Sequence, residues 1–527
     1  MSIGASSSLI AETTRSSSSS ARTKGLVIIG AFIHALATTN NNNNNNTNVC
    51  SKHNLKYCPK GAIVVSKDGT IEKVFSTFHS SSSTSHHSNL SSSISSSTSS
   101  PSLSSLLMPY EHYEHITLKP SQFLIPGFID THAHAPQYFN NGLGLDMPLL
   151  EWLHTYTFPV ESRFSDVEIA QRVYRSCVKR SLQNGTTTSV YFATIHNDAS
   201  LKLAEITEEL GQRAYIGKVN MDRFAPDYYC EETSKGISDA RKFVEDMLAR
   251  NFKLAKPILT PRFAVSCSEE LMKGLADIAE EYDLPIQSHI SENVNEVKLV
   301  KDLFKNQSSY AGVYDAVKLL NRRTILAHGV YLTDEEIKLL KEKKATIAHC
   351  PLSNFSLNSG VLNVRKLLNN GVKVSLGTDY SGGYSVSMLN AIRNTLIASA
   401  AVTTDHLRNA QEPTEDDKSL SLDEAFYLAT IGGACALNLE NKVGNFEEDK
   451  LFDALVVDVD VAESMVDTFS DIYPKIFPAE SSLAHDPETL TEKKLKENFA
   501  RFIFNGDDRN ITKIFVQGNE VSQKLKE

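Results

Sequence analysis

The sequence predicts an α/β protein, a (β/α)8 TIM-type barrel with a small β-sandwich domain formed from both chain ends. Three observations lead to this prediction. Eight short apolar runs alternate with helical patterns, polar residues end several of these runs, and further strand-like runs lie near both termini. Buried parallel strands have continuous apolar sequences, and eight β-α units are the number that forms such a barrel.

The eight apolar runs set the predicted barrel strands. They start near residues 128, 187, 214, 254, 285, 323, 345 and 373. Helical patterns separate most of them, for example Asp166–Gln183, Ser268–Tyr282 and Asp334–Glu342. The longest interval follows the first run, and long loops after barrel strands lie at the face where active sites are built.

The two chain ends are predicted to share the small β domain. Leu26–Leu36 and Ala62–Phe75 have strand-like sequences, and Asp68-Gly69 within the second is a hairpin signal. Near the other end, Ala454–Val459 and Ile511–Gly518 have the same character. We therefore expect these strands to meet in space.

Low-complexity stretches complete the predicted division of the chain. Asn40–Asn46 and the Ser-rich segment from about Ser80 to Ser105 contain too little apolar surface to offset the entropy of ordering, so we predict disordered insertions. The predicted parts are a disordered Ser-rich tail at 1–22, small-domain parts at 23–122 and 441–527, and the barrel at 123–440.

The composition argues against nucleic acids and membranes as partners. The chain has 53 Lys and Arg against 63 Asp and Glu, a formal net charge of −10, so no basic surplus is available to neutralise phosphates. The apolar run Leu26–Leu36 is shorter than the roughly 20 residues that cross a bilayer. The 7 cysteines are scattered without a CxxC pair, which fits a reducing compartment, and we predict a cytoplasmic protein.

The first predicted barrel strand ends in Asp130-Thr131-His132-Ala133-His134. Side chains alternate along a strand, so His132 and His134 point to the same face. Two imidazoles at this spacing can bind one metal ion, although an isolated HxH fits two ordinary histidines equally well. Asp130 either orients one of the imidazoles or caps the strand end.

Three other predicted strands also end in residues that bind metals. His289 ends the fifth strand, His328 the sixth and Asp379 the eighth. A lone histidine at a strand end is usually structural, but a barrel brings all of its strand ends to one rim. Three imidazoles and a carboxylate suit zinc, while iron or manganese accept the same ligand types.

Glu292 lies three residues beyond His289. From there it can reach a metal-bound water, whose proton a carboxylate can move because zinc lowers the pKa of that water to about 7. The alternative is a surface glutamate at a helix start, where the helix dipole favours an acidic side chain. The spacing alone does not separate the two interpretations.

Several segments, taken in order, match a known pattern. They include Pro126-Gly-Phe-Ile-Asp-Thr-His-Ala-His134, Asp146-Met-Pro-Leu-Leu-Glu-Trp-Leu153, Thr260-Pro-Arg-Phe263, Ser288-His-Ile-Ser-Glu-Asn293 and Gly377-Thr-Asp379. With His328, they resemble the amidohydrolase superfamily and, within it, the guanine deaminase family. The resemblance runs from about residue 120 to the C-terminus.

The resemblance implies a role for each residue in the pattern. One zinc ion per subunit would be held by His132, His134, His289 and Asp379. Proton transfer falls to Glu292 and Asp379, and His328 would assist the water or the transition state. The implied substrate contacts are Gln137, Trp152, Arg262, Phe263 and His289. The alternatives are a surface salt bridge for Arg262 and core packing for Trp152.

The implied reaction is hydrolytic deamination of guanine to xanthine and ammonia, in purine catabolism, by a homodimer. Hydroxide would attack C2 of guanine while Glu292 protonates the neighbouring N3. One rival function is deamination of a pyrimidine, a triazine or an adenosine derivative, against which Gln137, Arg262 and Phe263 argue. The other rival is a non-catalytic scaffold, against which the complete set of ligands argues.

Overall fold

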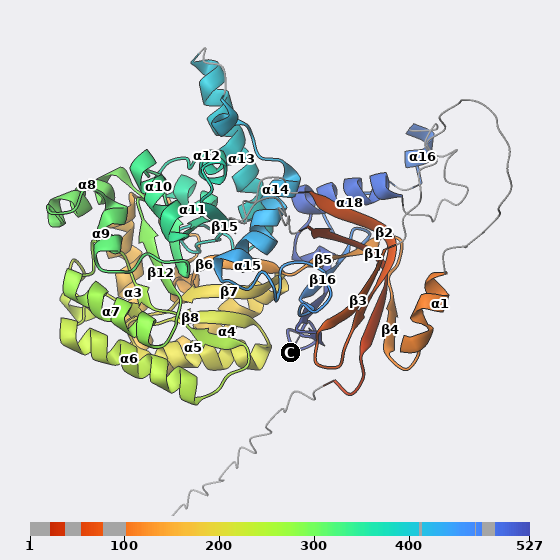
Figure 1. Cartoon of the computed structure of the whole chain (residues 1–527), viewed down its shortest axis with the longest axis horizontal. Helices are drawn as coiled ribbons and strands as arrows, with labels where there is room; N and C mark the ends of the chain where they lie inside the picture. The colour runs from red at the N-terminus through yellow and green to blue at the C-terminus, as the bar shows by residue number, and fades with distance from the viewer. Residues whose placement is uncertain are drawn as a thin grey trace, which may run out of the picture.

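The computed structural model describes residues 22–36, 54–76, 102–409, 414–469, 471–476 and 491–526. Figure 1 shows two parts side by side: an α/β part built from the middle of the chain, and a β-sheet built from both ends. The predicted Asn-rich insertion, most of the predicted Ser-rich insertion and nearly all of the Ser-rich tail lie outside the described residues. The prediction of disorder is wrong at the end of the Ser-rich segment, because Ser102 caps the short helix α1 (Leu103–Leu107).

The strands of the α/β part start within one residue of the eight predicted positions. Continuous burial explains the agreement, because nearly every residue in these strands is inaccessible to solvent. The strands are β6 (Phe128–His134), β7 (Thr186–Phe192), β8 (Arg213–Gly217), β10 (Ala255–Pro257), β12 (Ile286–Ile290), β13 (Thr324–His328), β14 (Thr346–His349) and β15 (Lys373–Leu376).

These strands form two parallel four-stranded sheets, in the orders β10-β8-β7-β6 and β12-β13-β14-β15. A short pair, β9 (Val219–Asn220) with β11 (Thr260–Pro261), lies beside them. Isolated hydrogen bonds join the two sheets: Asp379 N donates to the His132 carbonyl at 2.9 Å, and Gln287 N donates to the Leu259 carbonyl at 2.9 Å. The arrangement is mixed α/β with strands that run towards one rim, and closure into a complete barrel stays a prediction.

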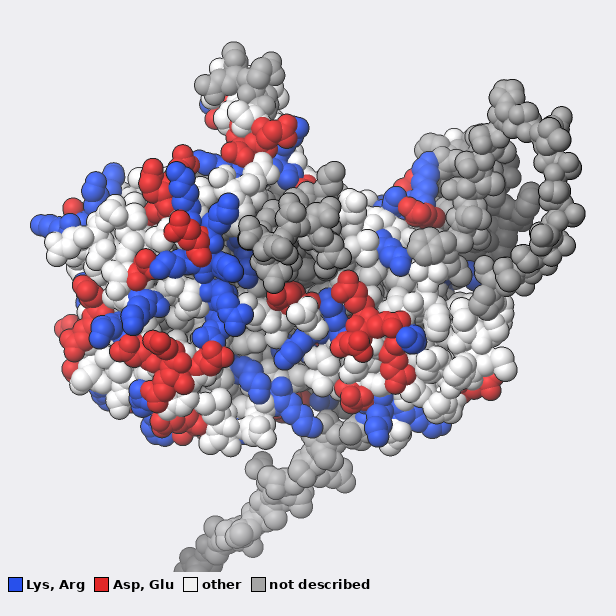
Figure 2. All heavy atoms as spheres, in the orientation of Figure 1, with Lys and Arg blue, Asp and Glu red and all other residues white. Residues whose placement is uncertain are grey.

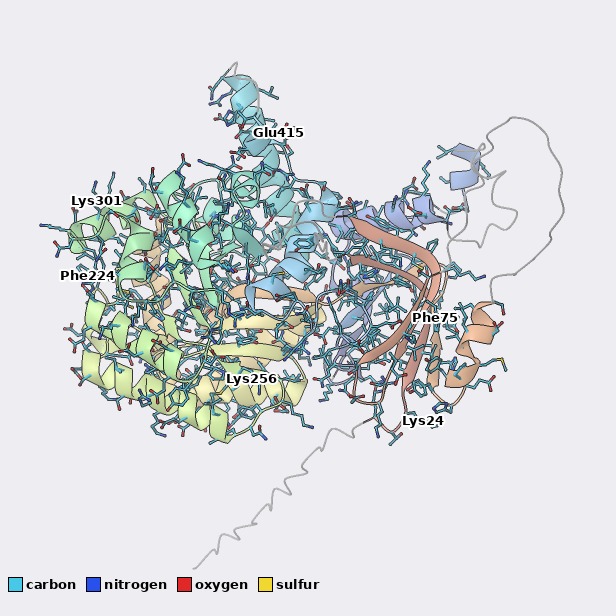
Figure 3. All side chains as sticks on the ribbon, in the orientation of Figure 1. Lys24, Phe75, Phe224, Lys256, Lys301 and Glu415 are labelled. Atoms are coloured by element: carbon cyan, nitrogen blue, oxygen red, sulfur yellow. The ribbon has the colours of Figure 1, made fainter. Side chains whose placement is uncertain are left out.

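Helices cover the outside of these sheets, as Figure 1 shows. The helices α4 (Val167–Gln183), α7 (Glu269–Glu281) and α10 (Asp334–Lys343) match the predicted ranges. Each begins at a residue whose side chain accepts a hydrogen bond from the first turn: Asp166, Ser268 and Thr333. Side chains fill the space between helices and strands (Figure 3), so the α/β part has a continuous apolar core.

The second part is one continuous eight-stranded sheet in the order β18-β17-β16-β5-β1-β2-β3, with β4 paired to β1. Its strands are β1 (Leu26–Ala35), β2 (Leu55–Val65), β3 (Ile71–Ser76), β4 (Glu114–Thr117), β5 (Gln122–Pro126), β16 (Ala454–Asp458), β17 (Ile511–Val516) and β18 (Asn519–Glu520). The two chain ends therefore share a sheet, as predicted.

This sheet differs from the predicted two-sheet sandwich. Strand β1 pairs with β2 along one edge and with both β4 and β5 along the other, so it joins the two halves. The register of β1 with β2 shifts between Gly30 and Phe32, which lets the strand bend. Apolar residues from both chain ends then pack into one cluster, including Ile28, Phe452 and Phe515.

The chain passes directly from the terminal sheet into the first strand of the α/β part. Only Gly127 separates β5 from β6, and a Cβ atom at this position would lie 2.1 Å from the hydroxyl of Thr187. Lys, Arg, Asp and Glu side chains are interspersed over the face in Figure 2. In the described residues, no helix has the length and apolar character needed to cross a membrane.

Candidate active site

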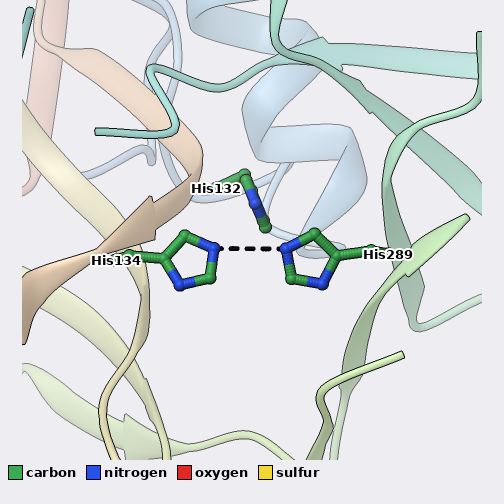
Figure 4. A group of neighbouring side chains, drawn as sticks. All are labelled: His132, His134 and His289. Atoms are coloured by element: carbon green, nitrogen blue, oxygen red, sulfur yellow. Dashed lines mark hydrogen bonds between the residues drawn. The ribbon is translucent and has the colours of Figure 1, made fainter. Parts of the chain in front are cut away.

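Three histidines meet at the rim of the α/β part (Figure 4). His132 and His134 come from the end of β6, and His289 comes from β12 in the other sheet. Nε2 of His134 lies 3.1 Å from Nε2 of His289. All three side chains are 9% exposed or less. The prediction that the two histidines of the HxH share a face is confirmed.

Asp379, which follows β15, completes this group. Its Oδ1 lies 3.1 Å from Nε2 of His132 and 3.4 Å from Nε2 of His134. The backbone of Asp379 has a φ of 48°, and that of His328 a φ of 76°. Residues other than glycine rarely adopt this region, so the fold holds His328, at the end of β13, and Asp379, shortly after β15, in a strained backbone conformation.

The protonation of these histidines suits a metal ion. Burial lowers the pKa of His132, His134 and His289, which favours the neutral form of each imidazole, the form that binds a metal. Nδ1 of His289 lies 2.6 Å from the Arg262 carbonyl oxygen, and because a carbonyl only accepts, this nitrogen donates. Its Nε2 therefore presents a lone pair to the site. Burial alone would raise the pKa of Asp379, but the imidazoles of His132, His328 and His289 lower it to about 2.

A buried imidazole nitrogen without a hydrogen-bond partner also indicates a metal site. Within the described part of the chain, Nε2 of His132 is buried and has no hydrogen-bond partner. It lies 3.1 Å from Oδ1 of Asp379, a separation that two ligands of one ion can have. Imidazole and carboxylate ligands of this kind fit zinc and related transition metals. Two groups could hold a metal ion in the described residues: His132, His134 and His289, and His132, His328 and Asp379.

His328 and Glu292 lie next to the four candidate ligands. Nδ1 of His328 donates to Oδ1 of Asn354 at 2.9 Å, which leaves Nε2 free to face Glu292 at 3.5 Å and Asp379 at 3.7 Å. Burial alone would lower the pKa of His328, but the carboxylates of Glu292 and Asp379 raise it. Burial also raises the pKa of Glu292 to about 7, a value suited to proton transfer near neutral pH.

The surface alternative for Glu292 is wrong. The side chain is buried and accepts a hydrogen bond from Ser359 at 3.2 Å. The first turn of helix α8 (Val294–Leu303) is capped instead by Asn293 and Glu296, which form a capping box. Glu292 is therefore available to the site.

Asp130 has the capping role rather than the orienting one. Its carboxylate accepts hydrogen bonds from the backbone N–H groups of His132 at 3.2 Å and Thr378 at 3.1 Å, and from the Thr378 hydroxyl. Among the described residues, its hydrogen bonds come from these backbone and hydroxyl groups and not from an imidazole ring, and burial raises its pKa to about 7. Asp130 ties the ends of β6 and β15 together, and both of these ends carry candidate ligands.

We predict that Asp130→Ala lowers the free energy of unfolding by about 2 to 4 kcal/mol, because it leaves buried donors without acceptors. Asp130→Asn is the matched control, because its amide oxygen still accepts from both backbone N–H groups. Urea unfolding of both variants at one zinc concentration measures the difference. Equal losses in the two variants would show that the hydrogen bonds to Asp130 do not stabilise the fold.

A cavity opens beside the candidate ligands. All of the predicted substrate contacts line it, which the sequence alone does not establish for residues so far apart. The lining consists of His134, Gln137, Leu149, Trp152, Leu153, Arg262, Phe263, His289, Glu292, His328, Leu357, Asp379 and Gly382. The lining thus combines apolar and aromatic side chains with titratable groups.

Comparison with known proteins assigns the family. A model described as the amidohydrolase family matches residues 123–521. A guanine deaminase of Dictyostelium discoideum is 48% identical over 401 residues, which cover 76% of this chain and 83% of the relative. The guanine deaminase of Homo sapiens is 46% identical over 407 residues, which cover 77% of this chain and 84% of the relative. This chain belongs to the guanine deaminase family.

A solved structure of the same family has the same fold. The guanine deaminase from C. acetobutylicum with bound guanine in the active site aligns with a TM-score of 0.75 and 35% sequence identity. The alignment covers 94% of this chain and 99% of the other. The guanine deaminase fold is therefore TIM-barrel-like, and the His/Asp group described above is a candidate metal site in a metal-dependent family.

The sequence reasoning missed one buried carboxylate of this guanine deaminase site. Glu161, in helix α3 (Phe158–Ser162), accepts hydrogen bonds from both Nη atoms of Arg262, at 2.6 and 3.2 Å, and from Nε2 of Gln137 at 2.8 Å. Arg262 does form a salt bridge, as the alternative prediction states. The pair with Glu161 is buried, however, and does not lie at the surface.

Trp152 combines its two predicted roles. The indole is 2% exposed and its Nε1 donates to the Leu143 carbonyl at 3.0 Å, yet the residue also lines the cavity. Phe263 lines the cavity too, and its ring centre lies 6.4 Å from that of His289 in an edge-on arrangement. Both aromatic residues are therefore fixed by packing before any ligand is bound.

Proposed function

We propose that this protein hydrolyses guanine to xanthine and ammonia with one zinc ion per subunit. The observation that carries the proposal is the meeting of Asp379, Glu292 and the candidate metal-binding histidines beside a cavity that Gln137 and Arg262 line. The family supports the same substrate, because relatives named guanine deaminase match most of the chain.

The proposed metal ligands are His132, His134, His289 and Asp379. Zinc bound there would supply an activated water at neutral pH. Asp379, whose pKa is about 2, stays ionised and accepts a hydrogen bond from that water. Nε2 of His328 faces the same position and can donate a hydrogen bond to the oxygen that attacks the ring.

Glu292 moves the protons in this proposal. Its carboxylate accepts a proton from the water and delivers it to N3 of the purine, so that C2 becomes tetrahedral without a build-up of charge on the ring. The hydroxyl group now bonded to C2 gives up the second proton of the water, which is transferred to the amino group; the C2–N bond then breaks, ammonia leaves, and the carbonyl of xanthine forms. One water is consumed for each ammonia released, which balances the reaction.

We expect purified protein loaded with zinc to convert guanine to xanthine and to leave adenine and cytosine unchanged at the same concentration. Loss of guanine absorbance, with metal analysis of the same sample, measures both activity and zinc content. An inactive protein at full zinc occupancy would contradict the proposal. Turnover of cytosine or adenine instead of guanine would support the rival amidohydrolase functions.

We also propose that the protein is a cytoplasmic homodimer with one complete barrel at residues 123–440. These statements rest on the resemblance to the family and on the sequence patterns. Light scattering on the purified full-length chain tests the dimer, and a monomeric mass across the concentrations used for the assay would contradict it. Fractionation of cells that express the protein tests its location.

A further inference from the structure

Glu161 is a buried carboxylate that neither the metal ligands nor the proton-transfer steps use. It is 0% exposed, and each of its oxygens accepts two hydrogen bonds. Oε1 accepts from Gln137 at 2.8 Å and from Arg262 at 3.2 Å. Oε2 accepts from Arg262 at 2.6 Å and from the Tyr229 hydroxyl at 2.8 Å. Two of these three donor residues, Gln137 and Arg262, line the cavity.

This carboxylate fixes the orientation of the Gln137 amide. A carboxylate can only accept, so the NH2 group of Gln137 must face Glu161 and its Oε1 must face the other way. In the described residues, Oε1 of Gln137 is buried and has no hydrogen-bond partner. A buried acceptor without a partner is costly, which indicates that a donor from a bound ligand satisfies it. Gln137 therefore offers an acceptor to a ligand in the cavity that it lines.

The same carboxylate fixes the charge and the position of Arg262. The guanidinium has five N–H donors, and the two-point contact with Glu161 leaves others available. Because the negative charge of Glu161 offsets the positive charge of Arg262, the part of the cavity that Arg262 lines does not require an anionic ligand such as a phosphate or a carboxylate. It suits a neutral ring edge that places a carbonyl beside an N–H group.

We propose that Glu161 is a positioning residue that sets the edge of the purine recognised by this site. It forces Gln137 to accept and Arg262 to donate, which matches the N1–H and C6 carbonyl that lie side by side in guanine. The inference rests on the proposed function and deepens it, because it assigns the preference for a 6-oxo ring to a residue that does not contact the ring.

The primary test is Glu161→Gln, which has the same size but lets Gln137 rotate and leaves Arg262 without a counter-charge. We expect KM for guanine to rise about 10- to 100-fold, with kcat changed much less and zinc content unchanged. The matched control is Asp453→Asn, which breaks the buried pair of Asp453 with Arg213 outside the cavity. We expect that control to keep the wild-type KM.

A binding comparison separates positioning from general damage. Hypoxanthine has the N1–H and C6 carbonyl but no amino group on C2, so it can bind without reacting. Unsubstituted purine lacks this edge. Calorimetry on the zinc-loaded wild-type protein should show tighter binding of hypoxanthine than of purine, by about tenfold or more. In Glu161→Gln, hypoxanthine should lose this advantage while purine binding changes little.

Tyr229→Phe provides a second variant in case Glu161→Gln does not fold. It removes one hydrogen bond to Glu161, and Tyr229 itself is not among the cavity-lining residues. We expect a rise in KM of about threefold, in the same direction. Glu161→Asp, which keeps the charge, should recover part of the preference for hypoxanthine that Glu161→Gln loses.

Equal loss of hypoxanthine and purine binding in Glu161→Gln would overturn the inference, as would an equal rise of KM in Asp453→Asn. An unchanged KM in Tyr229→Phe and Glu161→Gln would overturn it as well. If the wild-type protein does not turn over guanine, the proposed function fails. The hypoxanthine and purine comparison still tests Glu161 in that case, because neither ligand needs to react.

Discussion

Replacing Glu292 with glutamine is expected to lower kcat for guanine by about 10²- to 10⁴-fold while the zinc content stays at the wild-type level. The reason is that glutamine has the size of glutamate but cannot carry a proton from water to N3. Steady-state kinetics with metal analysis measure the effect. The matched control is Glu424→Gln, which changes a carboxylate paired with Arg365 on helices outside the cavity lining.

The pH profile gives a second measurement of the same role. Burial raises the pKa of Glu292 to about 7, so its carboxylate is fully populated only above that pH. Activity should fall about tenfold per pH unit on the acid side, since the protonated form cannot accept a proton from water. A bound cation favours the carboxylate, so the acid limb lies at or below pH 7. Near-normal turnover in Glu292→Gln would contradict this role, because proton transfer would then use another group.

Replacing His289 with alanine should remove the metal and, with it, activity on guanine. His289 presents a lone pair from β12, and its Nε2 lies 3.1 Å from that of His134. Loss of one ligand in four should weaken zinc binding by at least about 100-fold, since even changes beyond the ligands cost 10- to 100-fold. Zinc measured after dialysis against a zinc buffer tests the prediction.

The control for His289→Ala is His196→Gln, which removes a half-buried histidine that lies outside the metal group. We expect this control to keep its zinc and its activity. Full zinc occupancy in His289→Ala would remove His289 from the ligands. Thermal unfolding adds a further measurement, because a ligand that binds only the folded state raises its stability.

The sequence predicted the α/β part well because its strands are buried on both faces. Continuous apolar runs mark such strands, and polar residues directly after them, such as His289 and Asp379, stand out against that background. The rim that gathers these strand ends follows from the parallel arrangement alone. The candidate ligands can therefore be predicted from the sequence alone.

Glu161 and the terminal sheet were not predictable in the same way. Glu161 is one of many acidic residues on short helices, and only its complete burial against Arg262 and Gln137 distinguishes it. That burial depends on partners such as Arg262 and Tyr229, which lie far from α3 in the sequence. The single terminal sheet depends on the bend of β1 at Gly30, and hydrophobic patterns identify strands without fixing which edges pair.

The candidate ligands come from both four-stranded sheets, and this division has a consequence for the protein without its metal. His132 and His134 belong to one sheet and His289 to the other, while single backbone hydrogen bonds such as Asp379 N to His132 O join the two. An ion held by all of these residues would add a cross-link to the hydrogen bonds and apolar packing that already join the two sheets. Amide hydrogen exchange at Asp379 and Gln287 would then quicken when the metal is removed, while exchange inside each sheet stays slow. The rate of amide hydrogen exchange at these two residues would thus report metal occupancy without any turnover of substrate.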